Sequence, residues 1–110
     1  MLTLNLTIYC GTLFSQTLIW SENNAVVDLT DWKAKAQIKS ASAVYSLSTD
    51  NGQIALGTTG EIALTLSESV TATMSPGSYS WDILLMNPQG DVLPPLVAGV
   101  VTVLQGVTVW

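Results

Sequence analysis

Apolar and polar residues alternate along most of the chain with a period of two. The opening residues, MLTLNLTIYC, place Leu2, Leu4, Leu6, Ile8 and Cys10 on one side. The same alternation returns over residues 33–39, 60–66 and 78–87. Successive side chains of a β-strand point to opposite faces, so this period predicts strands that each bury one face.

Turn-forming residues separate these segments. Asn51-Gly52 is a strong β-hairpin signal, because both residues tolerate positive φ angles. Pro94-Pro95 does not fit the interior of a sheet and predicts an edge, a bulge or a switch between sheets. Residues 67–74 predict at most one short helical turn, capped by Ser67 or Ser69.

The pattern predicts one all-β domain over residues 1–110. A chain of 110 residues is the size of a single domain. About seven to eight short strands separated by turns are typical of an antiparallel β-sandwich. The strand parities predict a core that contains Leu4, Leu6, Ile8, Ile38, Ile62, Leu64, Tyr79, Trp81 and Ile83.

Charge is scarce in this chain. Only 10% of the residues are charged, against about 25% in typical soluble domains. Such a neutral surface does little to prevent association, which predicts that another protein covers part of it. The alternative is a soluble monomer whose surface is rich in Ser and Thr. The net charge of −5 argues against a nucleic acid partner, because phosphate binding needs many basic side chains.

The residues that enzymes use most often are missing or isolated. With no histidine and one cysteine, the sequence lacks a Ser-His-Asp triad and the usual zinc ligands. Cys10 falls on the apolar side of the first predicted strand, which favours a buried, inert thiol over a nucleophile.

Carboxylate pairs are the remaining route to catalysis. Asp28 and Asp31 are expected to stabilise turns through their side chains. Asp82 lies on the polar side of a strand and is expected to pair with Lys35 or Lys39. The sequence therefore predicts no catalytic, cofactor-binding or metal-binding residues, and a protein that is not an enzyme.

All three basic residues lie within the stretch DWKAKAQIK, residues 31–39. Lys33, Lys35 and Lys39 share the outward side of one predicted strand, with Gln37 in the gap. One interpretation is a basic stripe that docks an acidic surface of another subunit and fixes its orientation. The other is that lysines on an edge strand prevent aggregation between sheets. Both place this side of the strand away from the core.

Three tryptophans are candidates for a binding surface. Trp20 and Trp32 flank a predicted loop, and Trp110 is the third candidate. Tryptophan is enriched in protein-binding hot spots. A sugar-stacking platform is the alternative, so a carbohydrate- or cell-surface-binding module stays open.

Residues 92–104 form the most apolar segment, which is too short to span a bilayer. The N-terminus lacks the basic region of a signal peptide.

Six segments carry a resemblance to known proteins. They are DLTDW (28–32), AKAQIK (34–39), GEIALTLS (60–67), PGSYSWDILL (76–85), NPQGDV (87–92) and VAGVVTVLQGVT (97–108). Their order resembles the small immunoglobulin-like modules of tailed-bacteriophage virions, including N-terminal domains of baseplate and tail-fibre proteins. The span from residue 28 to residue 108 is about three quarters of the chain. The resemblance implies a single immunoglobulin-like β-sandwich.

The resemblance also implies a function. It indicates a non-enzymatic structural component of a virion, assembled as symmetric oligomers, with a trimer slightly favoured. A lone module suits an adaptor of the tail, baseplate or fibre attachment, and capsid decoration is the alternative. The expected partners are other virion proteins and further copies of the chain, without nucleic acid, membrane or cofactor. The expected location is the virion, after synthesis in the host cytoplasm.

Overall fold

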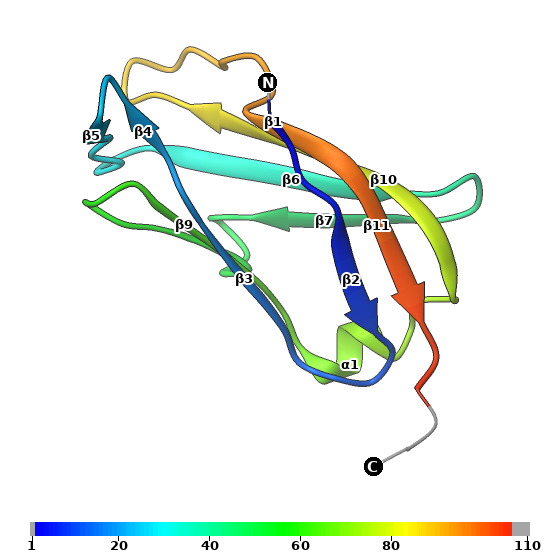
Figure 1. Ribbon diagram of the computed structural model, residues 1–110. Helices are drawn as coiled ribbons and strands as arrows, with labels where there is room; N and C mark the ends of the chain where they lie inside the picture. Colours follow the sequence, from blue (N-terminus) through cyan, green and yellow to red (C-terminus); the bar gives the residue numbers. More distant parts are fainter. Residues whose placement is uncertain (1, 107–110) are drawn as a thin grey trace.

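The computed structural model describes residues 2–106, which form two packed β-sheets (Figure 1). The larger sheet contains β1 (Leu2–Thr3), β2 (Leu6–Tyr9), β6 (Lys33–Lys39), β7 (Val44–Ser48), β10 (Gly77–Met86) and β11 (Val97–Leu104). The smaller sheet contains β3 (Phe14–Ile19), β8 (Ile54–Leu56) and β9 (Glu61–Leu66). The short strands β4 (Ser21–Glu22) and β5 (Ala25–Val26) pair at one end, and α1 (Glu68–Thr71) lies towards the other.

The order of strands differs from their order in the sequence. In the larger sheet, the spatial order is β7, β6, β10, β11, and each of these neighbouring pairs is antiparallel. Both β1 and β2 pair parallel with β11. In the smaller sheet, β9 lies between β3 and β8, and both pairings are antiparallel. An all-β sandwich is therefore confirmed, but it is not purely antiparallel as predicted, because β1 and β2 run parallel to β11. Eight strands have three or more residues, as the alternation predicted.

The predicted core is largely confirmed. Eight of the nine predicted residues are buried: Leu6, Ile8, Ile38, Ile62, Leu64, Tyr79, Trp81 and Ile83. The ninth, Leu4, is only half-buried and packs against the edge of the core. Its position follows from an interruption of the N-terminal strand.

The single strand predicted over residues 2–10 is two strands. The break is at Leu4 and Asn5, where the Trp81 indole N–H donates to the Leu4 carbonyl oxygen at 2.8 Å. The Asn5 side-chain oxygen accepts the Val100 backbone N–H at 3.0 Å, in place of a backbone carbonyl. A Cβ atom on Gly99 would collide with the Leu4 carbonyl oxygen, so the close approach requires glycine there.

The end of this N-terminal segment also differs from the prediction for Cys10. The Cys10 side chain is half-buried rather than buried, because it lies at the turn after β2. Its thiol donates to the Met74 backbone carbonyl at 3.3 Å, which ties the turn to the segment after α1.

Asn51-Gly52 forms a turn but not a β-hairpin, so that prediction is wrong. The preceding strand β7 pairs with β6 in the larger sheet, and the following strand β8 pairs with β9 in the smaller one. The turn therefore carries the chain from one sheet to the other. Pro94 and Pro95 likewise lie outside every strand, in the loop between β10 and β11.

The predicted helical turn is confirmed as α1, and Ser67 occupies its N-cap position, although its side chain makes no capping hydrogen bond. After α1 the chain turns into β10, where the buried Tyr79 hydroxyl donates to the Ser75 carbonyl oxygen at 2.7 Å. This hydrogen bond spans four residues and fixes the entry into the strand. Burial raises the pKa of Tyr79 above its ordinary value of 10.0.

Candidate docking surface

The three lysines point outward from β6, on the face of the larger sheet that lies opposite the core. Lys33, Lys35 and Lys39 are exposed, whereas Ala34, Ala36 and Ile38, which alternate with them, are buried. The residue in the gap, Gln37, is half-buried. The prediction that this side of the strand faces away from the core is confirmed.

The strand β6 is not an edge strand. It pairs with β10 on one side and with β7 on the other, each in a continuous antiparallel register. Lysines protect an edge only where unpaired backbone groups are available to another chain. The interpretation of these lysines as protection of an edge strand is therefore wrong.

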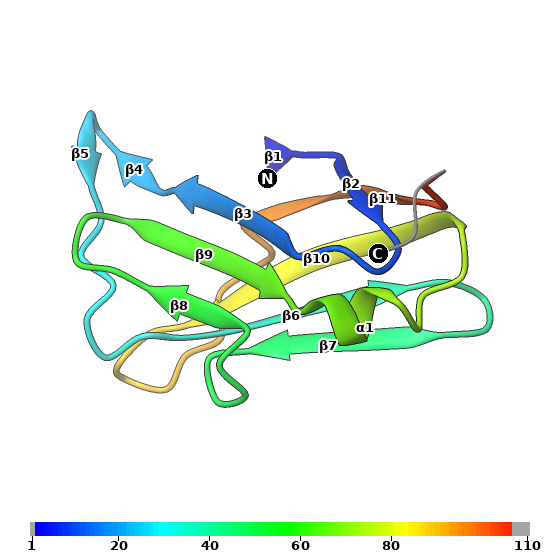
Figure 2. The ribbon, with the colours of Figure 1, turned by 90° about the horizontal axis from the view of Figure 1, so that it is seen from below.

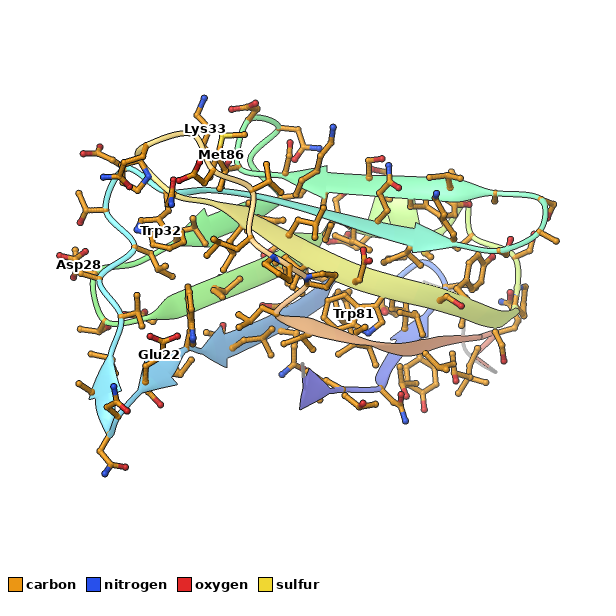
Figure 3. The ribbon with its side chains drawn as sticks, turned by 90° about the horizontal axis from the view of Figure 1, so that it is seen from above. Glu22, Asp28, Trp32, Lys33, Trp81 and Met86 are labelled. Carbon is orange, nitrogen blue, oxygen red and sulfur yellow. The ribbon has the colours of Figure 1, made fainter. Side chains whose placement is uncertain are left out.

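Small and apolar side chains surround the lysines on the outer face. Lys39 lies between Val44 of β7 and Ser80 of β10. Lys33 lies opposite Met86, and the two side chains are neighbours in Figure 3. Five large apolar side chains on this face are exposed: Tyr9, Val44, Met86, Val100 and Leu104. The surface therefore combines cations with uncovered apolar groups.

A shallow hollow of about 320 Å³ crosses this face over β6, β10 and β11. Its lining contains Gln37, Lys39, Ser80, Trp81, Asp82, Ala98 and Gly99. The hollow exists because the outward residues of β10 and β11 are small here. Its lining includes one cation, Lys39, and one anion, Asp82.

The expected pairing of Asp82 with a lysine is not seen. Asp82 lies directly opposite Gln37 on β6 and opposite Ala98 on β11. Lys35 and Lys39 lie diagonally across the strand, and within residues 2–106 neither forms an ion pair with Asp82 at 4.0 Å or less. The ammonium groups of Lys35 and Lys39 are thus not neutralised by Asp82.

Trp20 and Trp32 do not form an open aromatic platform. Both are half-buried, and their rings meet edge to face with centroids 5.5 Å apart. They pack against the core at the two ends of the segment that carries β4 and β5. Trp110, the third candidate, lies outside the described residues. This geometry gives a sugar-stacking site no support.

The loop between the two tryptophans contains the predicted aspartate turn. The Asp28 carboxylate accepts the backbone N–H and the hydroxyl of Thr30, at 2.9 and 2.6 Å. The hydrogen bond from the Thr30 hydroxyl, together with the one from the Thr30 backbone N–H, lowers the pKa of Asp28. Asp31 takes a left-handed backbone conformation, with φ of 64°. The predicted side-chain turn is therefore confirmed for Asp28, whereas Asp31 shapes the loop through its backbone and makes no such side-chain hydrogen bond within residues 2–106.

A metal-binding cluster and a membrane-spanning helix are both absent from the described range. Between residues 2 and 106, no group of three or more acidic or cysteine side chains is arranged to hold a metal ion. No helix in that range is long and apolar enough to cross a bilayer.

Comparisons with known proteins identify the fold. No protein-family model matches the chain, and no curated protein matches its sequence. A structure of a glycoside hydrolase from Bacteroides vulgatus matches 92% of this chain with a TM-score of 0.57 and 8% identity. The match covers only 16% of the hydrolase chain. A beta subunit of a voltage-gated sodium channel, studied for multimeric cell-adhesive interactions, matches with a TM-score of 0.50 and 14% identity. The match covers 93% of this chain and 92% of the chain of that subunit.

The chain is an immunoglobulin-like β-sandwich. Its Tyr79 occupies the place of the tyrosine corner of such domains, near the start of the strand and bonded to the backbone upstream. Trp81 follows two residues later, where antibody domains carry the second cysteine of their disulfide. A buried indole thus fills the position of a cross-link in this immunoglobulin-like sandwich.

The exposed apolar residues of the outer face were missed by reasoning from sequence. Val100 and Leu104 belong to a nearly continuous apolar run, in which parity alone does not separate inward from outward positions. A signal was present for Tyr9 and Val44, since both lie on the polar side of their alternating segments.

Proposed function

We propose that the chain is a non-enzymatic structural module of a virion that docks onto another virion protein through the outer face of its larger sheet. The observation that supports this most strongly is the concentration of all three basic side chains on one face of one interior strand. In a chain with eight acidic residues, that face is the only place where a partner meets basic side chains.

The proposed contact has two components. Lysine ammonium groups steer an acidic partner and set its orientation, because complementary charge affects specificity and association rate more than affinity. Val44, Val100 and Leu104 supply apolar area, whose removal from water contributes about 25 cal/mol per Å². The hollow beside Lys39 adds a shaped depression for one partner side chain.

The virion setting rests on the sequence resemblance to tailed-phage modules. An adaptor of the tail, baseplate or fibre attachment and a capsid decoration protein differ in the partner that they contact, and the same surface serves either. Immunoglobulin-like domains serve many unrelated functions, so the fold does not choose between these settings.

The test separates the setting from the surface. Virions released by cells that carry the gene are purified, and the chain is measured in them by quantitative mass spectrometry. We expect the wild-type chain to be present at a fixed number of copies per particle. Its absence from purified particles would refute the virion setting.

The surface is tested with a triple variant, Lys33→Gln, Lys35→Gln and Lys39→Gln. Exposed charges contribute only about 0–1 kcal/mol each to folding, so its melting temperature should match that of the wild type. Its incorporation into particles should fall at least tenfold. The matched control neutralises three charges away from the face, Glu22→Gln, Glu61→Gln and Glu68→Gln, which lie on β4, β9 and α1, and should be incorporated normally. Equal incorporation of both variants would rule out the basic stripe as the docking surface.

A further inference from the structure

The smaller sheet has one long edge that nothing covers in the described part of the chain. The strand β3 pairs with β9 on one side only, because the preceding segment crosses to the other sheet and pairs with β11 (Figure 2). The edge is six residues long, Phe14 to Ile19, and contains no charged residue and no proline. Charges and prolines are the usual means by which proteins block a strand edge.

The register identifies the free backbone groups. The Trp20 N–H donates to the Gly60 carbonyl oxygen at 2.8 Å, in line with the β3–β9 register. Bonded and non-bonded pairs alternate in an antiparallel ladder, so Phe14, Gln16 and Leu18 also bond to β9. The N–H and C=O groups of Ser15, Thr17 and Ile19 therefore point away from the sheet.

The other edges of the sandwich are blocked or short. The free edge of β7 is capped by the Asn51 amide, which accepts the Ser48 N–H at 3.1 Å and donates to the Ser46 carbonyl at 3.3 Å. The edge strand β8 has three residues and β2 has four. Among residues 2–106, β3 is thus the longest edge that is open to another strand.

Exposed apolar side chains lie at both ends of this edge. Leu13, immediately before β3, is 60% exposed, and Ile19, at its end, is 59% exposed. These are the two highest exposed fractions among the large hydrophobic residues described. An uncharged edge with such ends favours a neighbouring strand over solvent.

We infer that β3 pairs antiparallel with β3 of a second copy of the chain, across a two-fold axis at Thr17. Ser15 then lies opposite Ile19 of the other copy, and the two Thr17 residues exchange both backbone hydrogen bonds. Ile19 becomes the diagonal neighbour of Leu13 of the other copy, so each covers the other. The two small sheets join into one six-stranded sheet.

The edge is self-complementary, which identifies a second copy as the occupant. About a two-fold axis at Thr17 the two edges match in length, and the exposed Leu13 and Ile19 of one copy cover Ile19 and Leu13 of the other. Charge sets the direction: Glu61 lies opposite Ile19 and Glu22 follows three residues after it. Parallel pairing would place these acids against their copies, whereas antiparallel pairing puts them at opposite ends. This pairing favours an even-numbered assembly over the trimer that the resemblance favoured.

The experiment uses the full chain in sedimentation velocity from micromolar to millimolar concentration, with amide hydrogen exchange on the same samples. We expect a monomer–dimer equilibrium in which the Ser15, Thr17 and Ile19 amides become protected as the dimer fraction rises. Thr17→Lys should weaken the dimer at least tenfold. The matched control, Thr65→Lys, makes the same change on the neighbouring interior strand and should dimerise like the wild type.

A second variant keeps the test sharp if Thr17→Lys perturbs folding. Thr17→Pro removes only the N–H that faces away from β9, so the β3–β9 ladder stays intact while the edge is blocked. A chain that stays monomeric, or a dimer in which the Ser15, Thr17 and Ile19 amides exchange freely, would overturn the inference. So would protection of these amides in the monomer that is lost when residues 107–110 are deleted, since the chain's own end would then cover the edge.

Discussion

Truncating Trp81 should remove more stability than any other single side-chain change in this domain. Trp81 is 4% exposed and belongs to the hydrophobic core. Core Trp→Ala changes cost about 3–5 kcal/mol, and the domain has about 5–15 kcal/mol in total. The variant Trp81→Ala also leaves the Leu4 carbonyl oxygen without its 2.8 Å donor. We therefore expect it to be close to unfolding at 37 °C.

Trp81→Phe separates the two contributions. It keeps an aromatic ring in the core but removes the N–H that holds Leu4, so we expect a loss of about 1–3 kcal/mol. The loss should be local: the Leu4 amide, bonded to the Ala98 carbonyl at 3.0 Å, should exchange its hydrogen faster while the β10 amides keep their protection. Both variants are measured by urea unfolding followed by circular dichroism, with exchange measured by NMR.

The matched control is Trp32→Ala, the same truncation at a half-buried position. Less area leaves water there, so its loss should be clearly smaller than that of Trp81→Ala. Equal losses for the two alanine variants would refute the claim that Trp81 is the central core residue. An unchanged Leu4 exchange rate in Trp81→Phe would refute the anchoring role of the indole N–H.

Three further predictions concern the backbone, pH and the protected edge. Gly99→Ala should displace the Leu4 segment, because its Cβ collides with that carbonyl oxygen, and thermal melting should show a loss of several degrees. Since burial raises the pKa of Tyr79, the unfolded chain loses that proton first as pH rises, and stability should fall from about pH 10 upward. Tyr79→Phe should remove this part of the alkaline loss in urea unfolding, and Tyr9→Phe, on the outer face, should leave it. Asn51→Ala should uncover β7, with about 1–2 kcal/mol less stability and more self-association in light scattering.

The alternation of apolar and polar residues predicted which side chains point inward wherever a strand has one buried face. It succeeded for Lys33–Lys39 and for Tyr79, Trp81 and Ile83 because their strands lie inside the sheet, with one face on the core. This alternation contains no information, however, about which strands are neighbours in a sheet. That β6 is an interior strand depends on β7 and β10, which are distant in the sequence, and this decided between the two interpretations of the lysines.

The same limit explains the N-terminal break and the Asn51 turn. Leu2, Leu4 and Leu6 keep one parity, so nothing local indicates that the strand is interrupted between them. The interruption is set by Trp81 and Gly99, which meet Leu4 only after folding. At Asn51-Gly52 the local residues specify a turn, but which strands pair around it depends on contacts with β6 and β9.

Salt distinguishes the two proposed contacts, because they lie on opposite sheets and differ in electrostatics. Docking through Lys33, Lys35 and Lys39 brings unlike charges together, so added salt should weaken it. Pairing through β3 brings together two chains that each carry a net charge of −5 at an edge without charge, so screening should reduce their repulsion and strengthen the dimer. Sedimentation of the chain alone between about 0.05 and 0.5 M NaCl should show a rising dimer fraction, while its retention on purified particles falls. If salt dissociates the dimer as well, the self-contact runs through the lysine face, and the assignment of β3 as the self-association edge is wrong.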